Sequence, residues 1–305
     1  MKCIFIYNPV SGKGKIKKKI EYIVEKLKNK YDTVDVYETK ASGDMSRAAY
    51  DASFNYDAIV FAGGDGSFNE VLQGVVKSGE TPELGYIPGG TVNDIGHALK
   101  ISKNIKKALK VILNGKSERL DVIKSNDKYA MYVVAAGAFT SASYTTPQIN
   151  KKQIGRLAYG LEALKKNLKF DVFSIEVDNG IQKINTESVL VLAMNGRYVA
   201  GLPVNKWSSF NDGKLEMVLI KQRKNPKFFD KIGAYLALIR LFLFGNRFGI
   251  KEKQFIRIDG SKFKITVDDS VVWNFDGEKG NSGTVEIEVL HKKINMIVPK
   301  RLKNV

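Results

Sequence analysis

The sequence is poor in the residues that build disulfides, zinc sites and histidine-based catalysis. Its 305 residues include one cysteine, Cys3, and two histidines, His97 and His291. A single cysteine cannot form an internal disulfide, and no cluster of cysteine and histidine has the spacing of a zinc site. Neither histidine accompanies a Ser or Cys motif, so we expect both to be surface or packing residues rather than catalytic ones.

Long apolar runs are also missing. No segment reaches about 20 uninterrupted apolar residues, so no transmembrane helix is expected. The N-terminus has no signal-peptide pattern, and we therefore expect a cytoplasmic protein. The nearest candidate, residues 228–248, is interrupted by Lys231, Arg240 and Arg247. Its apolar residues recur at helical spacing, which favours a buried helix, with a helix lying on a bilayer surface as the alternative.

Acidic residues are outnumbered by basic ones. The chain has 49 Lys and Arg against 32 Asp and Glu, a formal net charge of +17. The basic residues cluster at 13–19, 221–227 and 292–301. Nucleic acid and anionic lipid both attract such surfaces. No helix-turn-helix, zinc finger or aromatic RNA-binding motif accompanies the charge, so no nucleic-acid partner is expected. An anionic membrane and a generally basic surface without a partner both remain open.

The pattern of apolar residues changes near residue 122. Before it, apolar strands alternate with amphipathic helices, which predicts an α/β domain with a parallel sheet. After it, many short strands predict a mainly antiparallel β-sandwich as second domain. The first part should hold strands near 2–7, 33–37, 58–62 and 84–87, and helices near 14–29, 43–53, 68–77 and 92–113. The second should hold strands near 119–124, 129–134, 173–177, 187–194, 214–220, 255–258, 263–267 and 285–290, and helices near 154–167 and 226–244.

Three glycine-rich turns stand where a predicted strand ends and a helix begins. They are residues 8–15, 63–70 and 88–96. The carboxyl ends of parallel strands meet at one edge of a sheet, and ligands bind in the crevice there. Glycine lets the backbone approach a phosphate, and a helix N-terminus offers free N–H donors. The pattern predicts a phosphate site. Asp65 would repel a bare phosphate, which indicates a metal, a reacting hydroxyl or a bound water nearby.

The turns do not contain the standard nucleotide motifs. There is no G-x-x-x-x-G-K-[ST] loop, and Asn69 occupies the place of the third glycine of G-x-G-x-x-G. Taken alone, residues 63–70 are as compatible with a tight turn and a solvated aspartate. Three polar turns at one edge of the same sheet favour the phosphate site.

Four motifs in this order resemble the diacylglycerol kinase catalytic-domain family, which includes soluble bacterial lipid kinases and is related to sphingosine and ceramide kinases. They are Asn8-Pro9-x-Ser11-Gly12, Gly63-Gly64-Asp65-Gly66-Ser67-x-Asn69-Glu70, Pro88-x-Gly90-Thr91-x-Asn93-Asp94 and Asn274-Phe275-Asp276-Gly277-Glu278. The resemblance covers almost the whole chain. It implies a first domain similar to NAD kinase and phosphofructokinase, residues 1–122, to which the tail 292–305 returns. Residues 123–291 would form the lipid-substrate domain.

The resemblance implies an enzyme that transfers the γ-phosphoryl group of ATP, assisted by Mg²⁺, to a lipid hydroxyl. Diacylglycerol is the leading substrate, and undecaprenol, phosphatidylglycerol and sphingoid bases are alternatives. The lipid would be met at the inner face of an anionic membrane, and a homodimer is compatible with the sequence. A kinase of a soluble acceptor also remains open, because NAD kinases and phosphofructokinases share a Gly-Gly-Asp motif. A third alternative is a nucleotide sensor without catalysis.

The same resemblance implies roles for individual residues. Glu278 would be the general base, a role that typically contributes about 10²–10⁴-fold to the rate, and Asp65 would organise metal or water or assist the base. The local sequence of Glu278 alone favours a solvated residue beside an Asp276-Gly277 hairpin turn, and the resemblance reverses that preference. The implied nucleotide-binding residues are Asn8, Pro9, Ser11, Gly12, Thr39, Gly64, Asp65, Gly66, Ser67, Thr91, Asn93 and Asp94.

A second metal site is implied near Asp212. Soluble bacterial members of the family carry a structural Mg²⁺ at an Asp-x-x-Asp-Gly segment. Here Asp212 matches the second aspartate, but Ser209 stands where the first should be. Mg²⁺ prefers an octahedral oxygen shell with carboxylate support, so the exchange weakens the expectation. A turn before the strand at 214–220 is the alternative.

Overall fold

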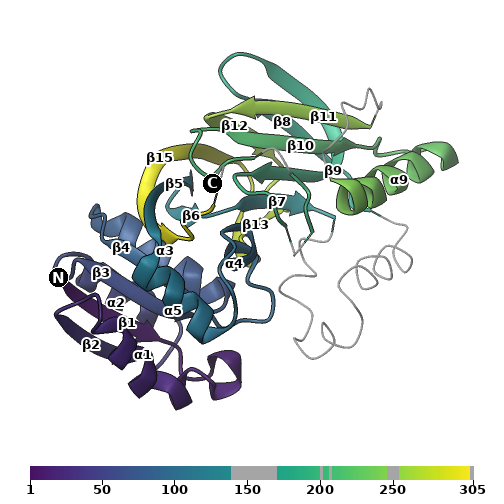
Figure 1. Cartoon of the computed structure of the whole chain (residues 1–305). Coiled ribbons are helices and arrows are strands. Elements are labelled where there is room, and N and C mark those ends of the chain that lie inside the picture. Colours follow the sequence, from purple (N-terminus) through teal and green to yellow (C-terminus); the bar gives the residue numbers. More distant parts are fainter. Residues whose placement is uncertain (139–169, 200–201, 206–207, 246–253, 303–305) are drawn as a thin grey trace. The chain divides into compact units, whose positions relative to one another are not determined.

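The computed structural model, drawn in Figure 1, forms two compact units. It describes residues 1–138, 170–199, 202–205, 208–245 and 254–302. Unit 1 comprises Met1–Val122, Phe210–Asp212 and Leu290–Val305, and unit 2 comprises Ile123–Ser209 and Gly213–Val289. The predicted division had placed residues 210–212 in the second domain, whereas the structure assigns them to unit 1. The helix expected near 154–167 lies outside the described residues.

The sheet of unit 1 is parallel, as predicted. Its strands are β1 (Lys2–Tyr7), β2 (Thr33–Glu38), β3 (Ala58–Gly63) and β4 (Glu83–Pro88), in the order β4-β3-β1-β2. All six residues of β3 are buried, which is the pattern of a central parallel strand covered on both faces. A late strand, β15 (Val285–Val298), pairs in parallel with β4 through Asn295 and Met296.

Helices connect the strands of unit 1. They are α1 (Ile20–Leu27), α2 (Asp44–Ser53), α3 (Asp65–Ser78), α4 (Asp94–Ala98) and α5 (Ile105–Asn114), with 3₁₀ turns at Ser11–Gly14 and Lys17–Lys19. The predicted helix 14–29 is wrong in its first turns. Gly12 and Gly14 have positive φ, which an α-helix does not allow, and the segment that follows is a 3₁₀ turn, so the α-helix begins only at Ile20. The predicted helical stretch 92–113 is broken at Lys100, whose φ is also positive.

Unit 2 is built from antiparallel pairs, again as predicted. Its strands are β6 (Lys128–Ala130), β7 (Val133–Gly137), β8 (Phe173–Asp178), β9 (Lys183–Met194), β10 (Leu215–Lys221), β11 (Phe255–Gly260), β12 (Lys262–Val267), β13 (Val272–Phe275), β14 (Glu278–Ser282) and the first part of β15. The order is β14-β13-β7-β9-β8-β12-β15, and β10 pairs with β9 and β11. The strand expected at 129–134 is divided into β6 and β7. β5 (Lys116–Ser125) enters from unit 1 and pairs with β6.

The long strand β9 organises the core of unit 2. Its first half pairs with β8 and its second half with both β7 and β10. The buried apolar side chains include Val134, Val191 and Trp273, and Trp273 is completely buried. Its indole N–H donates to the carbonyl oxygen of Gly283 at 2.7 Å, so the ring carries no unpaired donor into the core.

The helix expected near 226–244 is α9 (Phe228–Phe244), which packs against β10. It is drawn in green in Figure 1, beside the strands of unit 2. One side of the helix is buried through Ala234, Ala237, Leu238 and Leu241, so the interpretation as a buried helix is correct for that side alone. Among the helices that the structure describes, none has the length and apolar character to cross a bilayer.

Candidate functional site

The three glycine-rich turns of unit 1 lie against one another. Gly89 donates its N–H to the carbonyl oxygen of Gly63 at 2.7 Å, which joins the ends of β3 and β4. A Cβ atom on Gly90 would stand 2.6 Å from Cα of Gly64, and one on Gly12 would stand 3.3 Å from the carbonyl oxygen of Gly89. Only glycine permits the approach at Gly90, so these residues bring three backbone turns together at the carboxyl edge of the sheet.

Asn93 holds the third turn closed. Its Oδ1 accepts the N–H of Gly90 at 2.9 Å, and its Nδ2 donates to the carbonyl oxygen of Gly90 at 2.8 Å. The hydroxyl of Tyr86 also donates to Oδ1, at 3.3 Å. Asn93 is 1% exposed and has a φ of 54°, a left-handed conformation that asparagine tolerates better than most residues. The side chain thus supports the loop, and its contact with nucleotide stays a prediction.

Asp65 is the first residue of α3 and faces the start of α4. Its Oδ2 accepts the backbone N–H of Asn93 at 2.7 Å. Its Oδ1 is buried and has no hydrogen-bond partner among the described residues. Burial raises the pKa of Asp65 above the ordinary carboxyl value, and the backbone N–H groups around it, that of Asn93 foremost, oppose the rise. Oδ2 is therefore held by the protein, whereas the buried Oδ1 requires a proton, a water molecule or a cation as its partner.

The other predicted nucleotide residues of unit 1 differ in their access to solvent. Thr91 is exposed, and Thr39 is buried with its hydroxyl donating to the carbonyl oxygen of Tyr7 at 3.3 Å. Asn8 accepts the N–H of Val10 at 3.1 Å, which shapes the first turn. The half-buried members are Asn8, Pro9, Ser11, Gly12, Gly64, Gly66 and Ser67, and Asp94 is buried. A ligand at this edge would meet the half-buried set and Thr91 before it met Thr39.

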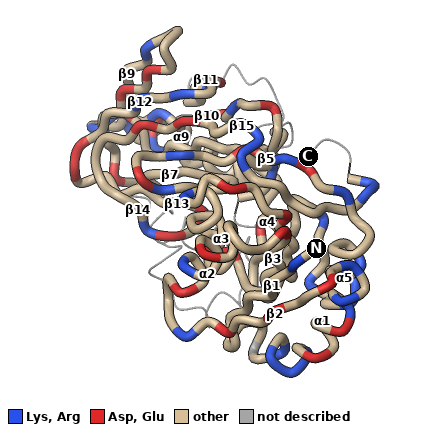
Figure 2. Tube along the Cα trace, turned by 90° about the vertical axis from the view of Figure 1, so that its left-hand side faces the viewer, with Lys and Arg blue, Asp and Glu red and all other residues tan. Residues whose placement is uncertain are grey.

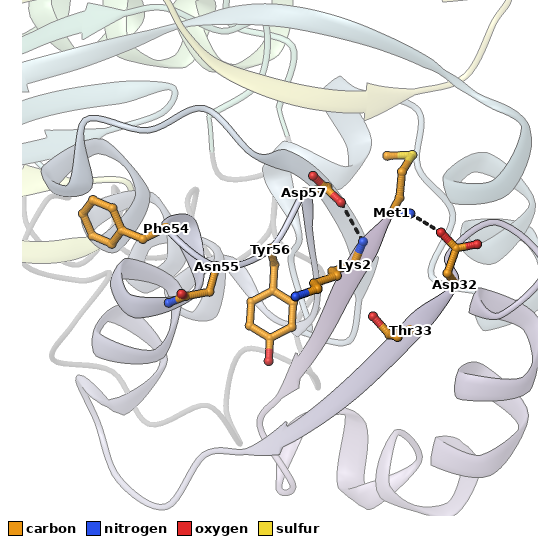
Figure 3. Close-up of a pocket in the computed structure, with 8 residues that line it drawn as sticks. All are labelled: Met1, Lys2, Asp32, Thr33, Phe54, Asn55, Tyr56 and Asp57. Carbon is orange, nitrogen blue, oxygen red and sulfur yellow. Dashed lines mark hydrogen bonds and ion pairs between the residues drawn. The ribbon is translucent and has the colours of Figure 1, made fainter.

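A hollow of about 540 Å³ lies at the opposite edge of the same sheet. Figure 3 shows the residues that line it: Met1, Lys2, Asp32, Thr33, Phe54, Asn55, Tyr56 and Asp57. Lys2 and Thr33 begin β1 and β2, so this is the amino edge of the strands. The Met1 amine pairs with the Asp32 carboxylate, and the Lys2 N–H donates to Asp57 at 2.6 Å. In both contacts, residues that line the hollow pair with one another. The hollow shares no residue with the glycine turns.

In unit 2, Glu278 follows a two-residue hairpin turn. Asp276 and Gly277 have φ values of 51° and 96°, and Phe275 pairs with Glu278 across them. Two successive positive φ values are typical of a type I′ turn, whose twist matches that of the flanking strands. The Asp-Gly pair is therefore the hairpin turn that its sequence predicts, and the exposed Glu278 begins β14.

Asp276 anchors this hairpin to the core of unit 2. Its carboxylate accepts the backbone N–H groups of Tyr132 and Val133, each at 3.0 Å, and that of Met131. The side chain is 4% exposed. Glu278 is therefore attached to a fixed turn rather than to a loose loop. Sequence reasoning noted Asp276 only as a turn residue, because its partners stand 143 to 145 positions earlier in the chain.

The implied structural Mg²⁺ site finds no support. Among the described residues, no group of three His, Cys, Asp or Glu could hold a metal ion. Asp212 is exposed, and Ser209 supplies no carboxylate. A Mg²⁺ ion that arrives with ATP is a different case, because it takes most of its ligands from phosphates and water and needs only one or two carboxylates. The buried, unpartnered Oδ1 of Asp65 fits that role.

Known proteins resemble this chain over nearly its whole length. Residues 2–125 match the family described as diacylglycerol kinase catalytic domain. A diacylglycerol kinase of Staphylococcus haemolyticus (strain JCSC1435) is 31% identical over 304 residues, 98% of this chain and 88% of the relative. A diacylglycerol kinase of Bacillus subtilis (strain 168) is 28% identical over 298 residues, 97% and 95% of the two chains. A crystal structure from Bacillus anthracis str. Sterne superimposes with a TM-score of 0.86 at 24% identity, covering 99% of this chain and 98% of that chain.

The shared fold is a parallel α/β unit followed by a mainly antiparallel unit, which confirms the predicted fold class. With the relatives, it defines the protein as a kinase, an enzyme that transfers phosphoryl groups. The chain belongs to the diacylglycerol kinase family, and the resemblance inferred from its four motifs is confirmed.

Proposed function

We propose that this enzyme transfers the γ-phosphoryl group of ATP to the hydroxyl group of a membrane lipid. Diacylglycerol is the proposed lipid and phosphatidic acid the product. The observation that carries the proposal is the close approach of the three glycine turns in unit 1. Gly64 and Gly90 leave no room for side chains between them, and such a backbone surface suits a triphosphate.

The phosphate-binding role rests on backbone donors and small side chains. The turn 63–67 leads into the N-terminus of α3, where free N–H groups and the positive end of the helix dipole favour an anion. Ser11 and Ser67 are half-buried near Gly63, and their hydroxyls are of the type that bonds phosphate oxygens. We assign the triphosphate to this edge, with Asn8, Gly12 and Thr91 around it.

The acceptor hydroxyl needs a base, because an alcohol is a poor nucleophile at neutral pH. In the proposed step, the hydroxyl oxygen bonds to the γ-phosphorus while the bond from that phosphorus to the bridging oxygen of the β-phosphate breaks. ADP leaves, and the hydroxyl proton passes to the carboxylate of Glu278. The Asp276 anchor supports this role, because a base must be held within hydrogen-bond reach of its proton.

Asp65 is the carboxylate that we assign to the phosphate end of the reaction. Asp65 would hold the Mg²⁺ that accompanies ATP, or a water on that ion, through the unpartnered Oδ1, and the ion would supply positive charge to the phosphates. The bond from Asn93 keeps the other oxygen of Asp65 in place. The lipid would be reached at the inner face of an anionic membrane, for which the net charge of +17 is favourable. Figure 2 marks the lysines and arginines in blue, and they occur along both units.

The test is transfer of labelled γ-phosphate from ATP and Mg²⁺ to lipids in anionic mixed micelles. The panel holds diacylglycerol, undecaprenol, phosphatidylglycerol and sphingosine, with a soluble sugar alcohol as the acceptor outside the membrane. Glu278→Gln should lower kcat by about 10²–10⁴-fold and leave the unfolding midpoint unchanged, because the side chain is exposed. Glu286→Gln, at another exposed glutamate of unit 2, is the matched control and should behave like the wild type.

Label in diacylglycerol that disappears in Glu278→Gln and Asp65→Ala would support the full assignment. Label in another lipid would keep the reaction and replace the substrate. Transfer only to the soluble acceptor, or ATP binding by the folded protein without transfer to anything in the panel, would overturn the lipid-kinase proposal.

A further inference from the structure

The outer side of α9 is apolar and is left exposed by the residues that the structure describes. Phe228 and Phe229 are 71% and 82% exposed, and Leu236 is 57% exposed. Ile232 and Leu243 continue the same stripe at 38% each. The positions 229, 232, 236 and 243 are separated by three, four and seven residues, the spacing of one helix face. They lie opposite the buried side that packs on β10. We call these five side chains the outer face of α9.

The outer face begins with a pair of aromatic rings. The rings of Phe228 and Phe229 stand edge to face, with centroids 5.7 Å apart. They sit on the first turn of the helix, whose start is fixed because Lys227 donates its N–H to Asp230 at 3.0 Å. Two exposed phenylalanines on this capped turn are unfavourable in water and would be stabilised by transfer to an apolar environment.

Basic side chains border the aromatic end. Arg223, Lys224 and Lys227 are exposed just before α9, and Lys231 is exposed on its first turn. Asp230 is the single acidic residue of the helix, and its carboxylate is occupied by the cap. An apolar stripe with lysine and arginine beside it matches an anionic bilayer surface, where the charged groups meet lipid phosphates and the apolar groups enter below them. A soluble protein partner would have to supply an acidic rim around an apolar groove.

We propose that the outer face of α9 is the surface through which this enzyme docks on an anionic membrane. The helix lies in the plane of the interface, with Phe228 and Phe229 at the depth of the acyl boundary and the basic residues among the headgroups. α9 has 17 residues, so it is suited to lie on the bilayer rather than to span it. This docking proposal rests on the proposed function, because a lipid substrate is what requires the enzyme to reach a membrane. Binding to the membrane can be measured without catalysis.

The test is binding of the intact protein to vesicles of phosphatidylcholine with and without phosphatidylglycerol, measured by cosedimentation without ATP. The wild type should bind the anionic vesicles and lose binding as salt is raised. Phe229→Gln with Leu236→Gln should weaken the binding about tenfold or more, since two large apolar side chains no longer leave water. Lys227→Gln with Lys231→Gln should weaken binding to anionic vesicles and leave the residual binding to neutral ones unchanged.

Matched controls are available in the same unit. Ile181→Gln removes an exposed apolar side chain at 91% exposure, and Lys264→Gln removes an exposed lysine of β12. Both should bind vesicles like the wild type. All variants should keep the wild-type unfolding midpoint, because none of the changed side chains is buried. Transfer of phosphate to a water-dispersed short-chain diacylglycerol should be unchanged in the Phe229→Gln, Leu236→Gln variant, while transfer to vesicle-bound diacylglycerol should fall with the binding.

The outcomes separate the docking proposal from the proposed function. Vesicle binding that depends on the outer face, in a protein that phosphorylates no lipid, would support the docking and overturn the function. Kinase activity on vesicles with equal binding by wild type and variants would overturn the docking and leave the function standing. A change from dimer to monomer in the Phe229→Gln, Leu236→Gln variant, with vesicle binding unchanged, would assign the face to a second copy of the chain and overturn the docking.

Discussion

The backbone N–H of Asn93 donates to Oδ2 of Asp65 at 2.7 Å. The two residues follow different strands, β3 and β4, and lie 28 positions apart in the sequence. The bond therefore fixes one turn relative to the other through the carboxylate that we assign to the phosphate end of the reaction. The orientation of Asp65 is set by the protein before any ligand binds, which removes an ordering cost from binding.

Exchange of Asp65 for asparagine should change the pH dependence of stability. Burial raises the pKa of Asp65, so the folded protein holds this proton more tightly than the unfolded chain does. The wild type therefore loses stability as the pH rises from the ordinary carboxyl value through the raised one. Asp65→Asn keeps the Oδ acceptor and does not titrate, so its stability relative to the wild type should increase across that window.

The measurement is urea unfolding of both proteins at a series of pH values from acid to neutrality. Each tenfold difference in proton affinity between the folded and unfolded states corresponds to about 1.4 kcal/mol in the free energy of unfolding. A stability difference that is constant with pH would contradict the prediction. Phosphoryl transfer by Asp65→Asn should be lost at every pH.

Gly90→Ala should separate two of the turns. The added Cβ would stand 2.6 Å from Cα of Gly64, a backbone atom that cannot rotate away. We expect a loss of about 1–3 kcal/mol in unfolding free energy from overpacking, and a larger relative loss of ATP affinity. Gly79→Ala is the control, because its cost comes from a φ of 82° with no atom within 4 Å of the new Cβ.

Calorimetric titration with ATP and urea unfolding distinguish the two glycine variants. Gly79→Ala should lose about 1–2 kcal/mol of stability and keep the wild-type ATP affinity. If Gly90→Ala and Gly79→Ala bind ATP equally well, the glycine turns are not the phosphate site.

Asp276→Ala should destabilise unit 2 strongly. Three backbone N–H groups, those of Met131, Tyr132 and Val133, would lose a buried acceptor. A buried unsatisfied donor costs about 1–3 kcal/mol, and water entering the site should recover part of that, so we expect a total loss of about 2–4 kcal/mol. Asp127→Ala, at an exposed turn residue of the same unit, should have little effect. Equal unfolding midpoints for the two variants would remove Asp276 as the anchor of the hairpin.

The single cysteine offers a chemical report on unit 1. Burial raises the pKa of Cys3 to about 12, and the side chain is completely buried in β1. Because thiol reagents attack the thiolate, native protein at mildly alkaline pH should label at the rate at which β1 opens, orders of magnitude below the rate in urea. Rapid stoichiometric labelling of the native protein would show that β1 is accessible. Cys3→Ser provides the blank.

The sequence predicted the parts of the fold that depend on local pattern. β3 was expected at 58–62 and is Ala58–Gly63, because a short apolar run between turn residues is a strong strand signal. The helix at 14–29 failed because a periodic apolar pattern does not register the positive φ of Gly12 and Gly14. The convergence of the glycine turns followed from strand direction alone, whereas their close approach depends on distances that no motif contains.

The remaining features depend on contacts between residues distant in the chain. Asp276 accepts N–H groups from residues 131–133, and no local pattern names such partners. For α9, the sequence predicts the helix but not which of its sides is buried. Both of its sides are apolar, with Leu238 buried and Leu236 exposed, so periodicity predicts a helix without saying which side the protein covers. Which side remains in water is decided by β10, an element that lies earlier in the sequence.

The path of β15 affects the order in which a newly made chain folds. Its first residues pair with β12 in unit 2, and Asn295 and Met296 then pair with β4 in unit 1. On the ribosome, β1 to β4 emerge early. The part of β15 that pairs with the outer edge of β4 is synthesised only after all of unit 2. During that interval β4 presents unpaired backbone groups, which are a template for pairing with other chains. The edge of the sheet that is made early is therefore the last to be covered, because unit 1 is completed only by the final residues of the chain.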